Sequence, residues 1–230
     1  MKVSAVLVGA GLGLRMGGPV KKPFLEIQGK PIFLRTIERF SEIGLVSEII
    51  FVVGESEIKS LREQWQATLD NYRVKKIVAG GKKRQDSVYN GICQTDPNAG
   101  IILIHDVVRP LVRKEHIEAV IHKVEESHAA ILAAPMKATV KEAGKDMFIQ
   151  RTIPRSSLWM AQTPQGFKRD LIVKVFEQFK NTGREFTDDA EMAEKAGYPV
   201  CIVPGTDENI KITTPEDIRL AEALLLRWVN

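Results

Sequence analysis

The sequence of 230 residues has few cysteines and histidines. Cys93 and Cys201 are the only cysteines, and they show neither CxxC nor Cys/His ligand spacing. We therefore expect no disulfide framework and no zinc site, and a reducing compartment fits this composition. The 4 histidines form no recognisable arrangement with a nucleophile, so the sequence disfavours hydrolase chemistry.

Long apolar runs and a one-sided charge are also missing. No stretch approaches the ~20 apolar residues of a membrane span. The apolar segment 3–14 is interrupted by glycines and lacks a cleavage pattern, so we do not expect a signal peptide. The net charge of +4 is spread along the chain rather than gathered in a basic stripe. We expect a cytoplasmic protein whose partners are small anions, not a membrane or a nucleic acid.

What the sequence does contain is a regular alternation of strand and helix patterns. With 44% apolar and 27% charged residues, the chain is long enough for one domain with a closed core. Apolar runs predict strands at 3–8, 49–53, 77–78, 101–104, 129–134 and 200–203. Helical periodicity predicts helices at 31–44, 58–69, 83–93, 117–124, 171–179 and 188–196, the last begun by Thr187, and one that opens at Thr214. This alternation predicts an α/β fold with a parallel sheet.

The alternation breaks between residues 136 and 164. This stretch has strand-like alternation, a turn at Gly144, and the aromatic residues Phe148 and Trp159 at positions that we expect to be exposed. It predicts a β-hairpin arm that leaves the body of the domain.

A glycine-rich loop follows the first strand. Its glycines, at 9, 11, 13, 17 and 18, allow backbone N–H groups to approach a phosphate. The loop does not match G-x-G-x-x-G, because Met16 stands where the third glycine belongs, nor does it match a P-loop. Arg15, Lys21 and Lys22 add positive charge for a polyphosphate. Taken alone, a tight turn with solvated cations explains the loop equally well.

Three further polar segments follow strands of the predicted sheet. Gly80 and Gly81 precede a run of cations and Ser87, Asp106 ends the strand at 101–104, and Lys211 lies in the polar loop at 207–213. A carboxylate at the carboxyl end of a buried strand is a candidate Mg²⁺ ligand. For His105 we favour a structural role. All these loops leave one edge of the sheet, so we expect them to converge.

Together, these motifs resemble the cytidylyltransferases that act on 2-C-methyl-D-erythritol 4-phosphate in the non-mevalonate route to isoprenoid precursors. The resemblance covers nearly the whole chain. It implies a Rossmann-like, doubly wound, mostly parallel sheet of the nucleotide-diphospho-sugar transferase type, a single domain over 1–230, and an arm at 136–164 used in dimerisation. The motifs are GAGLGLRMG at 9–17, GG at 80–81 with Arg84 and Ser87, HDVVRP at 105–110, Arg155 with AQTPQ at 161–165, FTDDA at 186–190, and NIKIT at 209–213.

The resemblance also implies roles for particular residues, with CTP as co-substrate and Mg²⁺ as cofactor. Arg15, Lys22 and Lys211 would be the catalytic cations, and Asp106 would lie by the metal. Cytidine would be held by Gly9, Ala10, Gly11, Gly13, Gly80, Gly81 and Ser87. The acceptor, a sugar-alcohol phosphate, would be bound by Arg109, Thr139, Arg155, Thr163 and Thr187. Arg155 would reach the site of the partner in a homodimer.

Some alternatives remain open at this point. The family usually reads Pro-Lys-Gln where this chain has Lys21-Lys22-Pro23, so either lysine could be the catalytic cation; the distance from Arg15 favours Lys22. Ribitol 5-phosphate is the alternative acceptor. An NAD-dependent oxidoreductase would need the missing third glycine. A nucleotide-binding regulator would bind CTP without releasing pyrophosphate.

Overall fold

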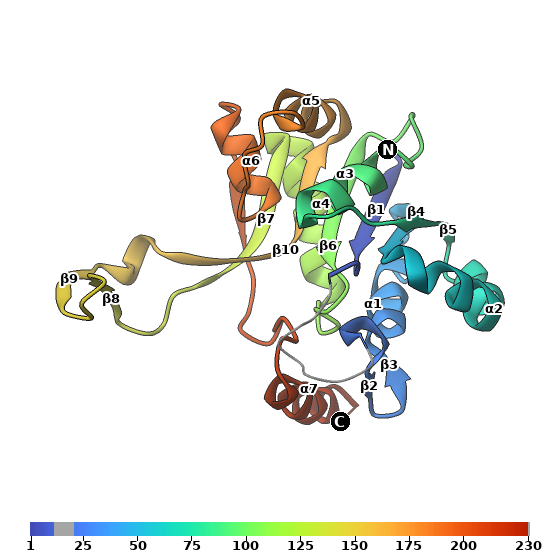
Figure 1. The fold of residues 1–230 in the computed structure, drawn as a ribbon, viewed down its shortest axis with the longest axis horizontal. Helices are drawn as coiled ribbons and strands as arrows, with labels where there is room; N and C mark the ends of the chain where they lie inside the picture. Colours follow the sequence, from blue (N-terminus) through green and yellow to red (C-terminus); the bar gives the residue numbers. More distant parts are fainter. Residues whose placement is uncertain (12–20, 230) are drawn as a thin grey trace.

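A seven-stranded sheet forms the centre of the molecule in the computed structural model, which describes residues 1–11 and 21–229 (Figure 1). The strand order is β11-β7-β10-β6-β1-β4-β5. The bounds are β1 Val3–Val8, β4 Val46–Val53, β5 Val74–Ala79, β6 Ile101–Asp106, β7 Ala129–Pro135, β10 Trp159–Lys168 and β11 Cys201–Pro204. The strands β1 and β6 are buried throughout, as their continuous apolar runs predict.

Every neighbouring pair in this sheet is parallel except the two pairs made by β10. β10 runs antiparallel to β6 on one side and to β7 on the other. β1 pairs in parallel with both β4 and β6, so Val8 of β1 lies beside Asp106 of β6. The carboxyl ends of the parallel strands therefore meet at one edge, as the alternation of strands and helices predicts.

Helices cover both faces of the sheet, so the expected doubly wound arrangement is confirmed. On one face, α1 (Ile32–Ser41), α2 (Glu55–Asn71) and α4 (Lys114–Ser127) bury their apolar sides against the strands. On the other face lie α3 (Arg84–Ile92), α5 (Arg169–Phe179) and α6 (Asp189–Lys195). α6 begins one residue later than expected, because Asp188, and not Thr187, accepts a hydrogen bond from the backbone of Glu191.

A smaller layer packs below the sheet in Figure 1. There α7 (Pro215–Val229) contacts the hairpin of β2 (Glu26–Ile27) and β3 (Lys30–Pro31), which follows the short helix η2 (Lys22–Phe24). Ile27, Ile32 and Leu225 are buried in this cluster. The apolar pattern of the sequence did not predict the two-residue strands of this hairpin.

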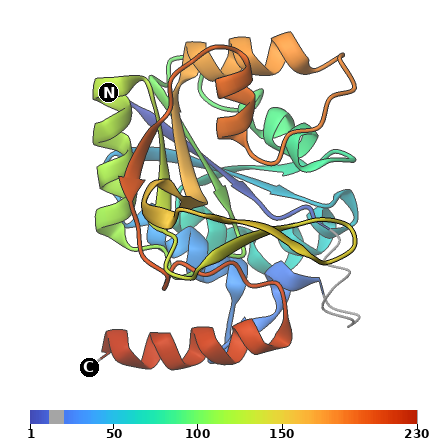
Figure 2. The same cartoon turned by 90° about the vertical axis from the view of Figure 1, so that its left-hand side faces the viewer.

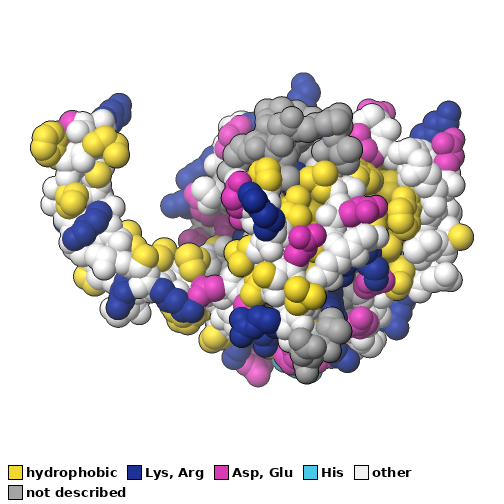
Figure 3. All heavy atoms as spheres, turned by 90° about the horizontal axis from the view of Figure 1, so that it is seen from below, with side chains coloured by type: hydrophobic (Ala, Val, Ile, Leu, Met, Phe, Trp, Pro, Cys, Tyr) yellow, Lys and Arg dark blue, Asp and Glu magenta, His cyan; other side chains and the backbone are white. Residues whose placement is uncertain are grey.

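The predicted arm is present and extends away from the body (Figures 1 and 2). Its hairpin consists of β8 (Val140–Ala143) and β9 (Ile149–Ile153), and η3 (Arg155–Ser157) follows. Met147, Phe148 and Ile149 at its tip are 82%, 75% and 63% exposed. Figure 3 shows apolar side chains gathered at the end of the arm. The excursion is shorter than expected, because residues 159–164 belong to β10 and the first of them pair with β7.

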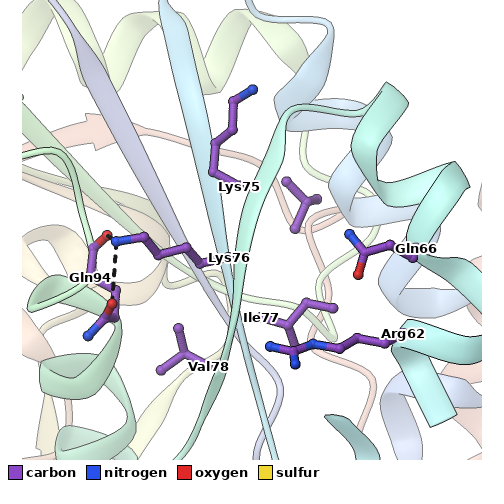
Figure 4. A pocket seen from close by; sticks show the side chains of 8 residues that line it. Arg62, Gln66, Lys75, Lys76, Ile77, Val78 and Gln94 are labelled. Atoms are coloured by element: carbon purple, nitrogen blue, oxygen red, sulfur yellow. Dashed lines mark hydrogen bonds between the residues drawn. The ribbon is translucent and has the colours of Figure 1, made fainter. Parts of the chain in front are cut away.

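The free edge of β5 carries a hollow of about 620 Å³. Figure 4 shows Lys76 directed to Gln94, with Arg62 and Gln66 extending from α2 toward β5. The ammonium of Lys76 donates to the backbone oxygen of Gln94 at 2.9 Å. Lysines on an edge strand oppose pairing with another chain, so we regard this hollow as edge protection. Within the described part of the chain, no helix is both long and apolar enough to cross a membrane.

Candidate active site

A cavity of about 990 Å³ opens at the carboxyl edge of the parallel strands. The four polar loops expected to converge do meet here. The lining includes residues from the ends of β1, β5 and β6, the start of α2, and the loop before α7: Val8, Gly9, Ala10, Gly11, Lys21, Lys22, Pro23, Gly54, Glu55, Ser56, Gly80, Gly81, Lys82, Lys83, Arg84, Ser87, Asp106, Val108 and Lys211.

Asp106 is the electrostatic centre of this cavity. Its Oδ1 accepts a hydrogen bond from Nε of Arg84 at 3.1 Å, and its Oδ2 accepts one from Nζ of Lys211 at 2.7 Å. Nε of Arg109 lies 4.0 Å from the same Oδ2. Burial alone would raise the pKa of Asp106, but Arg84, Lys211 and Arg109 outweigh it and hold the pKa far below its usual range. The carboxylate is therefore ionised at every physiological pH.

Arg109 has an unused donor beside this carboxylate. Its Nη1 donates to the backbone oxygen of Asn209 at 2.7 Å, which joins the arginine to the loop that carries Lys211. Its Nε is buried, and among the described residues it has no hydrogen-bond partner. A buried unpaired N–H group is costly, and Arg109 is outside the cavity lining, so an anionic ligand reaches this group only if the side chain moves.

His105 holds the end of β6 in place through a chain of hydrogen bonds. Oγ1 of Thr163 accepts from the backbone N–H of Asp106 at 3.1 Å and lies 2.9 Å from Nδ1 of His105. Because the backbone oxygen of Arg109 can only accept, Nε2 of His105 carries the ring proton and donates to it at 3.2 Å, and Nδ1 accepts from the hydroxyl of Thr163. Burial lowers the pKa of His105 to about 3, so the imidazole is neutral. The structural role expected for His105 accounts for both ring nitrogens.

The two glycine-rich loops lie against each other. A Cβ at Gly80 would lie 2.3 Å from Cβ of Ala10 and 2.8 Å from Oγ of Ser87, so only glycine fits there. Oγ of Ser87 accepts from the backbone N–H of Gly81 at 3.0 Å and donates to the backbone oxygen of Lys83 at 3.1 Å. Ser87 therefore fixes the shape of the second loop at the cavity wall.

The two candidate lysines differ in their surroundings. The ammonium of Lys21 is 2.6 Å from Oε1 of Glu57 in α2, which neutralises its charge. Burial would raise the pKa of Glu57, but hydrogen bonds from Lys21 and Ser56 reverse the shift and lower it. Lys22 begins η2, lines the cavity and is only 9% exposed. Lys21 and Lys22 both line the cavity, so either ammonium lies beside the space for a substrate.

Not every predicted site residue lies in the cavity. Gly13 and Arg15 fall outside the described residues. Thr139 and Arg155 are exposed on the arm, where the guanidinium of Arg155 donates to the backbone oxygen of Lys137. Thr187 is exposed before α6, and its hydroxyl bonds Oε2 of Glu191 at 2.8 Å. Thr163 is 4% exposed, with its hydroxyl engaged as described above.

Sequence reasoning missed the partners of the site cations. Arg84 also donates from Nη1 to Oδ2 of Asp189 at 2.9 Å, and Gln165 bonds the backbone at the start of α6. Arg84 and Asp189 both stand in the motifs quoted above, but they lie 105 positions apart in the chain, so no local pattern predicts their ion pair. The paired acids Asp188 and Asp189 at a helix start were the available clue.

The donor set at Asp106 fits a magnesium ion held mainly by a substrate. Among the described residues there is no group of three or more acidic, histidine or cysteine side chains that could form a metal cage. Mg²⁺ is commonly bound by one or two carboxylates together with phosphate oxygens and water. Asp106 supplies one such carboxylate at the cavity wall.

A doubly wound sheet whose glycine loops and cations surround one cavity defines an α/β nucleotide-binding enzyme. Residues 3–227 match the family described as 2-C-methyl-D-erythritol 4-phosphate cytidylyltransferase. The chain belongs to this family and is accordingly a nucleotidyltransferase.

Proteins of this family are similar to the chain over nearly its full length. The chain is 42% identical over 224 residues to 2-C-methyl-D-erythritol 4-phosphate cytidylyltransferase from Pelotomaculum thermopropionicum, covering 97% of this chain and 94% of that protein. It is 43% identical over 225 residues to the protein of the same name from Caldanaerobacter subterraneus, covering 98% and 99%. A solved structure of 4-diphosphocytidyl-2C-methyl-D-erythritol synthase from Anaerococcus prevotii superposes with a TM-score of 0.85 at 31% identity, covering 98% of each chain.

Proposed function

We propose that this chain transfers CMP from CTP to 2-C-methyl-D-erythritol 4-phosphate, giving 4-diphosphocytidyl-2-C-methyl-D-erythritol and pyrophosphate. The observation that carries the proposal is the convergence of Arg84, Arg109 and Lys211 on Asp106 beneath two glycine loops. The family membership and the relatives named above support the same reaction. The product is an intermediate of the non-mevalonate route to isoprenoid precursors.

The reaction is an in-line displacement at phosphorus. An oxygen of the acceptor phosphate forms a bond to the α-phosphorus of CTP, and the bond from that phosphorus to the bridging oxygen of the β-phosphate breaks. A phosphate monoester has a second pKa of about 6, so it is largely dianionic at neutral pH and needs no general base. The protein must instead overcome repulsion between two anions and stabilise the departing pyrophosphate.

The residues divide this work according to their positions. Gly9, Ala10, Gly11, Gly80, Gly81 and Ser87 would surround the cytidine. Gly13 and Arg15, for which the resemblance implies roles beside them, lie outside the described residues. Lys22 and Lys211 would hold the triphosphate, and the unused N–H of Arg109, together with Thr187, would receive the acceptor phosphate. Asp106 would bind Mg²⁺, which would neutralise phosphate charge during the displacement.

The proposal also covers the projecting arm and the cellular location of the protein. The projecting arm would carry Thr139 and Arg155 into the site of a partner subunit, so the active form would be a homodimer. The apolar side chains at its tip support a docked arm, because exposed apolar patches mark interaction sites. The two free cysteines support a cytoplasmic location.

A pyrophosphate-release assay tests the proposal. The purified protein with CTP and Mg²⁺ should release pyrophosphate with 2-C-methyl-D-erythritol 4-phosphate, and at least about tenfold more slowly with ribitol 5-phosphate or with ATP in place of CTP. Asp106→Asn is the matched variant: it should fold and lose about 10²-fold in kcat. Faster turnover of ribitol 5-phosphate would show that this compound is the acceptor. No release of pyrophosphate with CTP would refute the proposed function.

A further inference from the structure

A second buried carboxylate lies directly behind the proposed site. Asp189 is the first residue of α6 and is 1% exposed. Its Oδ2 accepts from Nη1 of Arg84 at 2.9 Å, while Nε of the same guanidinium donates to Asp106 at 3.1 Å. Arg84 therefore bridges two carboxylates through its planar fork, a geometry that lysine cannot reproduce. Asp189 itself is outside the cavity lining given above.

Gln165 sets the position of Asp189 from the neighbouring strand. Its Oε1 accepts from the backbone N–H groups of Asp189 at 3.1 Å and Ala190 at 2.9 Å. Its Nε2 donates to Oδ2 of Asp188 at 2.9 Å. Gln165 is 1% exposed and lies in β10, opposite Ile104 of β6. The start of α6 is thus fixed to the strand beside the one that carries Asp106.

The positive charge of Arg84 lies between the two carboxylates of Asp106 and Asp189. Arg84 carries one positive charge and shares it with Asp106 and Asp189. Burial raises the pKa of Asp189 above its ordinary value, while its ion pair with Arg84 favours the charged form. With Asp189 ionised, the pair of Arg84 and Asp189 is neutral overall, so Asp106 retains its negative charge toward Lys211 and a metal ion. With a neutral residue at position 189, the full charge of Arg84 would act on Asp106 and reduce its attraction for Mg²⁺.

From this geometry we infer that Asp189 is a positioning residue, which acts through Arg84 to hold the carboxylate of Asp106 ready for a metal-bound triphosphate. Arg84 also begins α3 directly after the Gly80–Gly81 loop. The same contact therefore ties that loop to the carboxyl end of β6. The inference rests on the proposed function and deepens it, because it concerns how the metal-binding carboxylate is held.

Asp189→Asn tests the inference with the least change in shape. The amide keeps the size of the side chain and an oxygen for Arg84, but removes the charge. Losing such a supporting contact costs about 10- to 100-fold in metal affinity or activity. We expect kcat to fall at least about tenfold, KM for CTP to change less than about threefold, and the Mg²⁺ concentration for half-maximal rate to rise about tenfold. Calorimetric titration of Mg²⁺ into the protein with saturating CTP, without acceptor, should show that the variant binds Mg²⁺ more weakly in the absence of turnover.

Glu194→Gln is the matched control, because it removes one negative charge from an exposed position of the same helix. It should stay within about twofold of wild type. Adding Arg84→Gln to Asp189→Asn should cost no more than the worse single change, because the two residues act as one unit. Equal behaviour of Asp189→Asn and Glu194→Gln, or losses that multiply in the double variant, would overturn the inference.

Two results separate this inference from the proposed function. If Asp189→Asn does not fold, Arg84→Lys provides the test: its ammonium reaches one carboxylate only, so the Mg²⁺ requirement should rise, and an unchanged requirement would count against the inference. If wild-type protein transfers no CMP, the proposed function fails. The calorimetric comparison of CTP and Mg²⁺ binding still decides the role of Asp189.

Discussion

At the scale of single residues, His105 is a buried polar side chain whose two ring nitrogens both have partners within the protein. His105 connects Thr163 to the backbone oxygen of Arg109, and it directly precedes Asp106, which lines the cavity. The ring also packs against Phe40 at 4.8 Å between centroids. A proton on this imidazole would break the bond from Thr163 and place a charge in the core.

His105 should therefore make the protein sensitive to mild acid. Its pKa is 6.5 in an unfolded chain and about 3 here, so between these values the unfolded state binds the extra proton and stability falls as the pH falls. Between these pH values, the free energy of unfolding falls by about 1.4 kcal/mol for each pH unit of acidification. His105→Gln should start less stable but lose less stability on acidification. Urea unfolding of both proteins at pH values of about 7, 6 and 5 checks this. Parallel losses in the two proteins would show that His105 is not responsible.

At the scale of elements, the two glycine loops fit together because Gly80 has no side chain. Gly80→Ala would overpack the contact with Ala10 and Ser87, at a cost of about 1–3 kcal/mol, or roughly 10- to 100-fold in kcat/KM for CTP. Gly44→Ala is the control, since nothing lies within 4 Å of its Cβ and it does not line the cavity. Steady-state kinetics with CTP should separate the two variants. Comparable losses would mean that the loops do not rely on this contact.

Elements with a simple apolar pattern were predicted well from the sequence, and β10 was not. The strands at 3–8 and 101–106 are buried on both faces, so their apolar runs identify them. β10 contains Gln162 and Gln165, which are 6% and 1% exposed. These side chains are buried because they bond Thr206, Asn209 and the start of α6. Such distant partners leave no local pattern, so residues 159–164 resembled part of the arm.

The candidate site was predicted in part for the same reason. The glycine loops and Asp106 follow strands, and the rule that parallel strands end at one edge brings them together. The ion pairs of Arg84 with Asp189 and of Lys21 with Glu57 depend on how helices pack against the sheet. No spacing in the chain encodes those contacts.

At the scale of the whole molecule, the arm provides a test for the shared site. Lys22 lies at the cavity and Arg155 on the arm, so in a two-fold dimer their substitutions would damage different halves of a site. The Lys22→Ala and Arg155→Ala variants should each have low activity when refolded separately. Unfolding and refolding them together in equal amounts should give about half mixed dimers, each with one intact site, and so roughly a quarter of wild-type sites.

The control for that experiment is each variant refolded alone at the same total concentration. Pyrophosphate release should rise only in the mixture. If Arg155 acts within its own chain, every site retains one defect and mixing restores nothing.

The reversed strand β10 also sets the order in which the molecule can be assembled. β10 lies between β6 and β7, yet it follows both in the chain. As the chain emerges from the ribosome, β1, β4, β5 and β6 can pair among themselves, while β7 has no place in the sheet until residue 168 has been made. Contacts between distant segments form slowly. The bonds made by β10 to the end of β6, the loop before α7 and the start of α6 therefore come together as a late step, and a partly synthesised chain has no complete site.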